Sequence, residues 1–134
     1  RARTQTAPTT FPVGGWTNLP GATLFYPVAA GTTRLFNVAF SAECRVNNGG
    51  PDDHMRIRII DTVTGLVLEP HDGAQVFCSD TGYATHKGNW VRRFGPGNHN
   101  LQVQFFLVDG PPFENVPPVT ASIDDWTFEV VIYT

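Results

Sequence analysis

Residues 35–46 read LFNVAFSAECRV, and their alternation decides the fold class. The polar side chains fall on the alternate positions, at Asn37, Ser41, Glu43 and Arg45. Successive side chains of a strand point to opposite faces, so a period of two predicts a long strand with one buried and one hydrated face. The predicted inward set is Phe36, Val38, Phe40, Ala42, Cys44 and Val46.

The same alternation recurs along the chain, and no useful window shows a helical period. Strands are predicted at residues 54–61, 83–94 and 100–108, with a bulge at Gly88 inside the second of them. The segment 95–98, GPGN, predicts a tight turn that joins the last two strands as a hairpin. Further strands are predicted at residues 9–16, 21–28, 66–69, 74–80 and 122–134.

Eight or nine short strands with regular turn signals predict an all-β, two-sheet antiparallel sandwich or a barrel. A jelly roll is preferred, because it fits a long first strand and a C-terminal strand deep in a sheet. An immunoglobulin-like sandwich is the alternative, but Val76 stands where the tyrosine of that fold is expected. The four prolines in residues 110–120 predict a loop. Residues 14–134 form the expected single domain, preceded by an N-terminal arm of residues 1–13.

The charge composition excludes several classes of partner. Charged residues make up 16% of the 134 residues, and the net charge is −3, with both signs mixed along the chain. Nucleic-acid binding requires a basic face, so no nucleic-acid partner is expected. No apolar run approaches the ~20 residues of a membrane helix, so no membrane span is expected either.

Cys44 and Cys78 are the two cysteines of the chain. Their spacing fits no zinc signature, which leaves one disulfide or two buried thiols as alternatives. A lysine-poor β domain rich in Thr, Asn and Gly is typical of exported proteins, where disulfides persist. We therefore expect a Cys44–Cys78 bridge and an extracellular location.

Two segments carry a resemblance to known proteins: LPGATLFYPVAAGTTRLFNVAFSAECRV at 19–46 and SIDDWTFEVVIYT at 122–134. They resemble β-sandwich domains of secreted bacterial proteins and of phage tail or virion proteins. The general shape of those domains is similar to the C1q/TNF-like jelly roll. The resemblance implies an exported or virion domain that trimerises or binds surfaces, and it carries over no catalytic residue.

Loop carboxylates raise the question of a calcium site. The candidates are Asp52 and Asp53, together with Asp124 and Asp125, which are expected at a bulge or at the start of the closing strand. Calcium requires several hard oxygen ligands, but no established calcium-loop spacing occurs here. Ordinary turn chemistry is the alternative, because Asp side chains accept hydrogen bonds from nearby backbone groups. The histidines are expected to be exposed loop residues: His54, His71, His86 and His99.

No catalytic residue is predicted, since the sequence contains no GxSxG motif and no glycine-rich phosphate loop before a helix. Aromatic side chains outside the core set indicate binding instead: Trp16, Tyr26, Tyr83, Trp90 and Tyr133. Core packing is the alternative for each of them. The preferred contact surface for a ligand or partner combines Tyr83 and Trp90 with Lys87 and Arg92.

The N-terminal arm contains the segment Thr9, Thr10, Phe11 and Val13, which can pair with its own sheet or with a neighbouring subunit. The first functional hypothesis is therefore a non-enzymatic structural subunit of an extracellular or virion assembly. Such a homo-oligomer, a trimer or a filament, would associate through sheet edges and the arm. The alternative is a lectin-like module that binds a glycan or a surface, with calcium as an optional cofactor.

Overall fold

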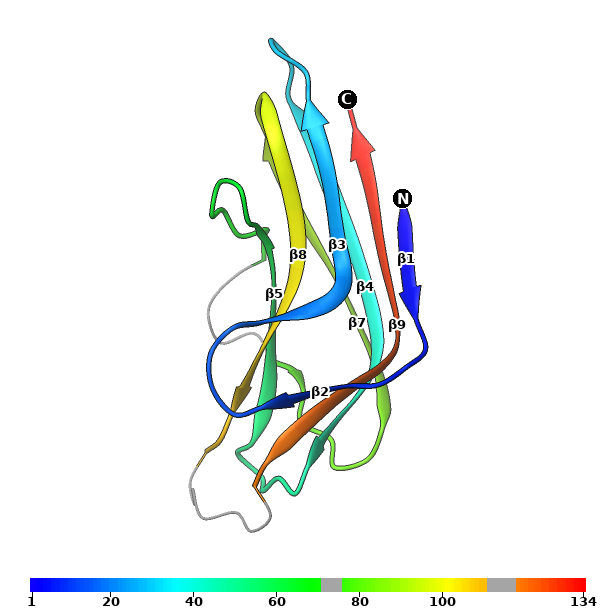
Figure 1. The fold of residues 1–134 in the computed structure, drawn as a ribbon, viewed down its shortest axis with the longest axis vertical. Coiled ribbons are helices and arrows are strands. Elements are labelled where there is room, and N and C mark those ends of the chain that lie inside the picture. The colour runs from blue at the N-terminus through cyan, green and yellow to red at the C-terminus, as the bar shows by residue number, and fades with distance from the viewer. Residues whose placement is uncertain (71–75, 111–117) are drawn as a thin grey trace.

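The computed structural model describes residues 1–70, 76–110 and 118–134, and it shows two antiparallel sheets packed against each other (Figure 1). All nine elements in these ranges are strands, so the predicted all-β sandwich is confirmed. Most of the predicted loop at 110–120 and His71 lie outside the described residues.

Sheet A contains the two longest strands, which lie side by side at its centre. These are β9 (Thr120–Tyr133) and β4 (Arg34–Asn47). At one edge, β7 (Ala84–Phe94) pairs with β4. At the other edge, β1 (Ala2–Gln5) and β2 (Thr9–Pro12) pair with successive parts of β9. The predicted arm is thus part of its own chain's sheet.

Sheet B is built around β8 (Gly97–Val108), which pairs with β3 (Thr17–Val28) on one side and β5 (His54–Asp61) on the other. The short strand β6 (Val76–Cys78) completes the sheet beside β5. The outer strands β3 and β6 form its two edges.

The strand order is that of a jelly roll. Sheet A has the order β1-β9-β4-β7 and sheet B the order β3-β8-β5-β6, with β2 continuing the edge that β1 begins. If β1 and β2 are taken as one interrupted first strand, the two sheets read 1-8-3-6 and 2-7-4-5. The C-terminal strand therefore lies inside a sheet, as the sequence predicts.

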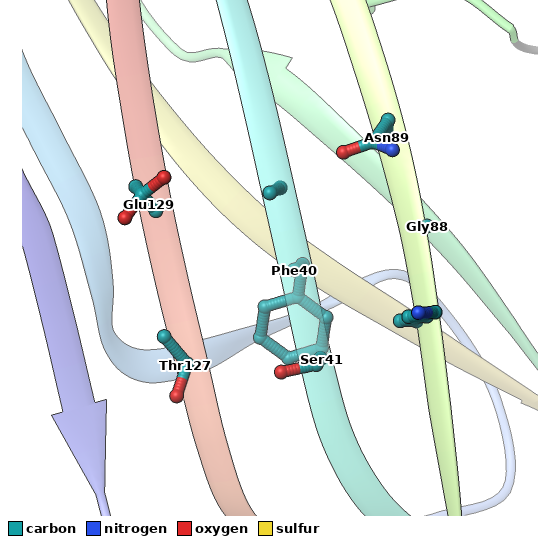
Figure 2. A pocket seen from close by; sticks show the side chains of 8 residues that line it. Phe40, Ser41, Gly88, Asn89, Thr127 and Glu129 are labelled. Atoms are coloured by element: carbon teal, nitrogen blue, oxygen red, sulfur yellow. The ribbon is translucent and has the colours of Figure 1, made fainter.

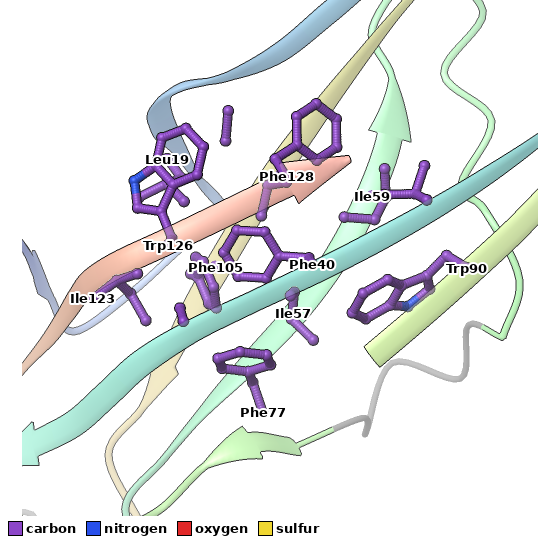
Figure 3. Packing of buried hydrophobic residues seen from close by; sticks show 14 of the residues in the cluster. Leu19, Phe40, Ile57, Ile59, Phe77, Trp90, Phe105, Ile123, Trp126 and Phe128 are labelled. Carbon is purple, nitrogen blue, oxygen red and sulfur yellow. The ribbon is translucent and has the colours of Figure 1, made fainter. Parts of the chain in front are cut away.

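The core fills the space between the sheets with aromatic and branched side chains (Figure 3). Phe40 of β4 lies 5.9 Å from Phe105 of β8, centroid to centroid, and Phe77 of β6 lies 5.4 Å from the same ring. Trp126 packs beside Phe40 at 6.3 Å. Burying each such side chain stabilises the fold by about 2 kcal/mol.

A disulfide joins the two sheets. Cys44 on β4 is bonded to Cys78 on β6, and both residues are buried in the core. The alternation in residues 35–46 placed Cys44 on the inward face, and the structure confirms this orientation.

The predicted hairpin of residues 83–94 and 100–108 is wrong. The two strands lie in different sheets, because β7 pairs with β4 whereas β8 pairs with β3 and β5. The turn around Pro96 carries the chain across the sandwich. Each strand buries one face in either arrangement, so the alternation does not distinguish a hairpin from a crossing between sheets.

The predicted bulge at Gly88 is also wrong. The pairing of β4 with β7 runs without a shift from Arg34–Phe94 to Cys44–Ala84. Gly88 is required for packing instead, since a Cβ at this position would lie 2.7 Å from the Trp90 ring.

A bulge does occur in β9, inside the strand rather than at its start. Asp125 and Trp126 together face the single residue Ala42 of β4. Asp125 adopts a φ of 45°, a left-handed conformation that Asp tolerates better than most residues. The bulge turns Trp126 into the core and leaves the carboxylates of Asp124 and Asp125 on the outer side.

The expectation of exposed loop histidines fails most clearly at His99, which is buried on β8. Its Nδ1 lies 2.8 Å from Asp61 Oδ2, and its Nε2 lies 2.9 Å from the carbonyl oxygen of Gly95. Each ring nitrogen thus lies within hydrogen-bonding distance of an acceptor oxygen, and these two contacts hold the ring in place. His54 and His86 lie half-buried on β5 and β7, where His86 contacts Asp80.

Candidate functional site

The outer face of sheet A has small side chains at its centre and longer polar ones on both sides. Ala39 of β4 stands between Asn89 of β7 and Glu129 of β9 in the register of the sheet. In the next row, Ser41 stands between Lys87 and Thr127. The side chains of the central strand β4 are therefore shorter than those of β7 and β9, and the surface is lowered along β4.

This relief forms an open depression of about 420 Å³, which we call the trough (Figure 2). It runs along β4 and spans the three strands β7, β4 and β9, which is about 10 Å at the spacing of a sheet. Gly88 contributes only backbone to the β7 side, because the position of its missing Cβ faces the core. The lining residues are Ala39, Phe40, Ser41, Lys87, Gly88, Asn89, Thr127 and Glu129.

The walls of the trough offer an ammonium, a carboxylate, an amide and two hydroxyl groups. Within the described part of the chain, none of these side-chain groups makes a hydrogen bond to another protein group. They are therefore available as donors and acceptors for a ligand. Among the described residues, Ser41 makes no hydrogen bond to Lys87 or Glu129.

One end of the trough leads to an exposed apolar area. Val91 and Val131 flank Asn37 in the register, and the next row carries Leu35 beside Tyr133. The exposed fractions are 39% for Val91, 40% for Val131 and 49% for Tyr133. This area, the apolar end, is suited to contact with a ring face or with another protein.

The opposite end leads to three carboxylates. Glu43 of β4 faces Asp124 of β9, and the bulge brings Asp125 beside them. One carboxylate oxygen from each residue lies within 4.8 Å of the others. Three such hard oxygen donors are the kind of ligand that calcium takes, although calcium binds six to eight oxygens in total. Asp124 and Asp125 thus stay candidates, with Glu43 as a partner that the sequence did not reveal.

The other pair of calcium candidates lies elsewhere and is explained differently. Asp53 is buried, where its two carboxylate oxygens accept hydrogen bonds from the backbone N–H groups of Gly50 and Gly110 at 2.5 and 2.8 Å. This is the turn chemistry given as the alternative. Asp52 is exposed and does not join the carboxylates of β9.

The predicted contact surface does not come together as one surface. Trp90 is a correction: it is 1% exposed, because even-numbered residues of β7 face the core. Arg92 donates a hydrogen bond to the carbonyl oxygen of Val67. Tyr83 is exposed, with the Arg45 guanidinium 4.5 Å from its ring. Lys87 alone of the four lines the trough.

The other aromatic candidates are divided between two faces. Tyr26 is half-buried and packs edge-on against Phe36 in the core, with their centroids 5.5 Å apart. Trp16 lies under the guanidinium of Arg58 on sheet B. Tyr133, at the apolar end, is the aromatic candidate that lies on the face of the trough.

The arm residues pair with the chain's own β9. Thr9 and Thr10 face Ile123 and Ser122 in the register, and Phe11 is buried in the core. Val13 is exposed and forms an isolated bridge with Leu107.

No protein-family model matches the chain, and no curated protein matches it either. In the described ranges, no helix has the length and apolar character needed to cross a membrane.

Proposed function

We propose that this protein is a non-enzymatic, exported binding module that holds a hydroxyl-rich glycan in the trough. The observation that carries the proposal is the surface of sheet A, where small side chains are flanked by polar groups that have no hydrogen-bond partner in the described part of the chain. Sugar hydroxyls both donate and accept, and the walls of the trough provide both functions. The inter-sheet disulfide is compatible with an extracellular or virion-surface location.

The geometry supports an elongated ligand that lies along β4. Leu35 lies four positions from Ala39 along β4, which corresponds to about 13 Å. A ligand of a few sugar units in the trough would thus reach the ring of Tyr133, on which a sugar face can stack.

The test is a screen of neutral glycans, followed by titration calorimetry with the best ligand. Ala39→Leu fills the floor of the trough on an exposed surface, so the variant should fold and bind at least about tenfold more weakly. Asn98→Leu adds the same side chain at an exposed position of sheet B and should bind like the wild type. If Ala39→Leu binds the glycan as tightly as Asn98→Leu, the glycan does not bind in the trough.

Calcium assistance is tested separately by thermal unfolding with and without calcium chloride. Calcium bound by Glu43, Asp124 and Asp125 would stabilise the folded state, so the Tm of the wild type should rise. Asp125→Asn should reduce this rise. If calcium leaves the Tm of the wild type unchanged, calcium has no part in the proposed function.

A second candidate is a structural subunit of an extracellular or virion assembly that self-associates as a trimer or filament. The apolar end supports it, and so does the edge of β7. Val91 exchanges both backbone hydrogen bonds with Glu69, so alternate residues such as Thr85, Lys87 and Asn89 direct their backbone groups toward the same edge. No described strand pairs with that edge.

Molar mass from light scattering distinguishes the two candidates. A structural subunit should give an oligomer that Val131→Lys dissociates, because the charge would be buried in the contact. A binding module should stay monomeric and keep its glycan affinity in this variant. A monomer at high protein concentration would reject the structural subunit without affecting the first proposal.

A further inference from the structure

The outer face of sheet B carries an arrangement of basic and aromatic side chains that the trough does not use. On β5 the odd-numbered residues Met55, Ile57 and Ile59 are buried, so Arg56 and Arg58 point outward. Both arginines are half-buried, and the register places them beside Phe106 and Gln104 of β8. No described carboxylate forms an ion pair with either of them.

Arg58 is held in one position by its neighbours. Its guanidinium carbon lies 4.4 Å from the centroid of the Trp16 ring, and its Nε donates a hydrogen bond to Gln104 Oε1 at 2.7 Å. Gln104 Nε2 in turn donates to Asn18 Oδ1 at 2.8 Å. Trp16 also packs edge-on against Phe106, with their centroids 5.5 Å apart. Burial lowers the pKa of Arg58, because the cation is partly removed from water.

The guanidinium of Arg56 carries a buried hydrogen-bond donor for which the described residues provide no acceptor. Its Nε is enclosed by protein and has no hydrogen-bond partner among residues 1–70, 76–110 and 118–134. The nearest residues in the register are Phe106 on one side and Val76 on the other, and both are apolar. An enclosed donor on a charged group without an acceptor costs free energy, so an acceptor oxygen of a ligand at this position would be stabilised.

We propose that Arg56 and Arg58 form a binding site for an anionic polysaccharide, one that bears sulfate or carboxylate groups. The two side chains leave the same strand two residues apart, about 7 Å, so one ligand can contact both guanidinium groups. A guanidinium binds the oxygens of such groups with paired, charge-assisted hydrogen bonds. The exposed amide of Asn18 borders the site and suits the hydroxyl groups of a sugar.

The same observations favour a polysaccharide over single-stranded nucleic acid. Nucleic-acid strands bind through bases that stack on open aromatic faces. Here a face of the Trp16 ring is covered by Arg58, and its surroundings are filled by Phe106. The remaining surface around the two arginines offers amide groups rather than a stacking platform.

The fluorescence of the chain provides a direct readout. Trp90 and Trp126 are 1% and 2% exposed, whereas Trp16 is half-buried beside Arg58. Titration with dextran sulfate at low salt should therefore change the tryptophan emission through Trp16, and neutral dextran should not change it. Trp16→Phe should lose the signal, while calorimetry still detects binding.

Variants assign the site to the two arginines. Arg56→Gln and Arg58→Gln should each weaken dextran sulfate binding by about tenfold and make it less sensitive to salt. Arg93→Gln removes a cation from the exposed side of β7 in sheet A and should change the affinity less than twofold. Circular dichroism confirms that each variant is folded. Arg56→Gln is the cleaner test, because it leaves the contact of Arg58 with Trp16 in place.

Three results would overturn the proposal. The first is the absence of dextran sulfate binding by the wild type at low salt. The second is equal weakening in Arg56→Gln and Arg93→Gln, which would indicate attraction to total charge rather than a site. The third is tighter binding of oligo-dT than of dextran sulfate, which would assign the face to nucleic acid. None of these results depends on the trough, so the proposal stands or falls independently of it.

Discussion

At the scale of single residues, Asp61 shows how one buried charge is stabilised. The residue is fully buried at the end of β5, between the two sheets. Burial alone raises the pKa of its carboxyl group, but hydrogen bonds outweigh that effect and leave the pKa below its ordinary value. The donors are His99, Asn100, Thr64 and Val63.

Asp61→Asn should destabilise the protein by about 3 kcal/mol near neutral pH, since an amide cannot accept all the hydrogen bonds that the buried carboxylate accepts from its four donors. A carboxyl with a lowered pKa in the folded state contributes stability above its unfolded pKa, near 3.8, and loses it as pH falls through the folded pKa. The difference between variant and wild type should therefore shrink in acid. Urea unfolding at pH 7 and pH 3 measures it, with the exposed Asp52→Asn as the control. A difference that is equal at both pH values would contradict this account.

Gly88 provides a second prediction at this scale. In Gly88→Ala the added Cβ would lie 2.7 Å from the buried Trp90 ring, so the ring must shift in a packed core. We expect a loss of about 1–3 kcal/mol in the free energy of unfolding. Gly82→Ala is the matched control, because nothing lies within 4 Å of its Cβ position. Chemical denaturation compares the two, and equal stability would show that the Trp90 ring is loosely packed.

Gly88 and Trp90 also show the limit of reading single residues from sequence. A glycine inside a strand indicates either a bulge or a close contact, and the sequence pattern does not distinguish them. Trp90 stands at an inward position of β7, but the strand is polar enough to suggest a surface. The decisive facts are the regular register with β4 and the core around Trp90, both of which depend on distant parts of the chain.

At the scale of elements, the longer strands were predicted well because each depends on local alternation. The predicted strand at 66–69 forms isolated bridges instead, and β1 was not predicted. Residues 54–61 match β5, and the inward set of residues 35–46 is buried as expected. The predicted pairing of residues 83–94 with 100–108 was wrong, since pairing depends on contacts across the whole chain. The trough is a feature that depends on strand pairing. Its hydrated face follows from alternation, but the meeting of Ser41 with Lys87 and Thr127 follows from the register of three strands.

The arm provides a prediction at the scale of elements. Because Phe11 is buried beside Phe105, at 5.6 Å between centroids, removal of residues 1–13 should cost the isolated chain about 3–5 kcal/mol. If the arm pairs within its own sheet, this cost is independent of protein concentration. Thermal unfolding at two concentrations tests this, with light scattering to report the mass. A full-length Tm that rises with concentration would show that the arm docks into a neighbouring subunit.

At the scale of the whole molecule, the two sheets present opposite faces to solvent and are held together in two ways. The core contacts are distributed over the whole interface, whereas the disulfide is a single covalent link between β4 and β6. The trough lies on sheet A and the two arginines lie on sheet B. Each site is formed by paired strands, so both sites require the folded sandwich. The disulfide between the sheets therefore stabilises the fold on which both sites depend.

Replacing both cysteines, as Cys44→Ala with Cys78→Ala, should lower the free energy of unfolding by about 4 kcal/mol. The bridge closes a loop across a sequence separation of 34, and that loop restricts the unfolded chain. Guanidinium unfolding of the wild type, the variant and the wild type with a reducing agent measures the effect. The reduced wild type and the variant should unfold at similar concentrations, both well below the oxidised protein. Because the core remains, the variant should still fold and keep its two faces. Loss of folded structure in the variant would mean that the core alone is too small to hold the sheets together.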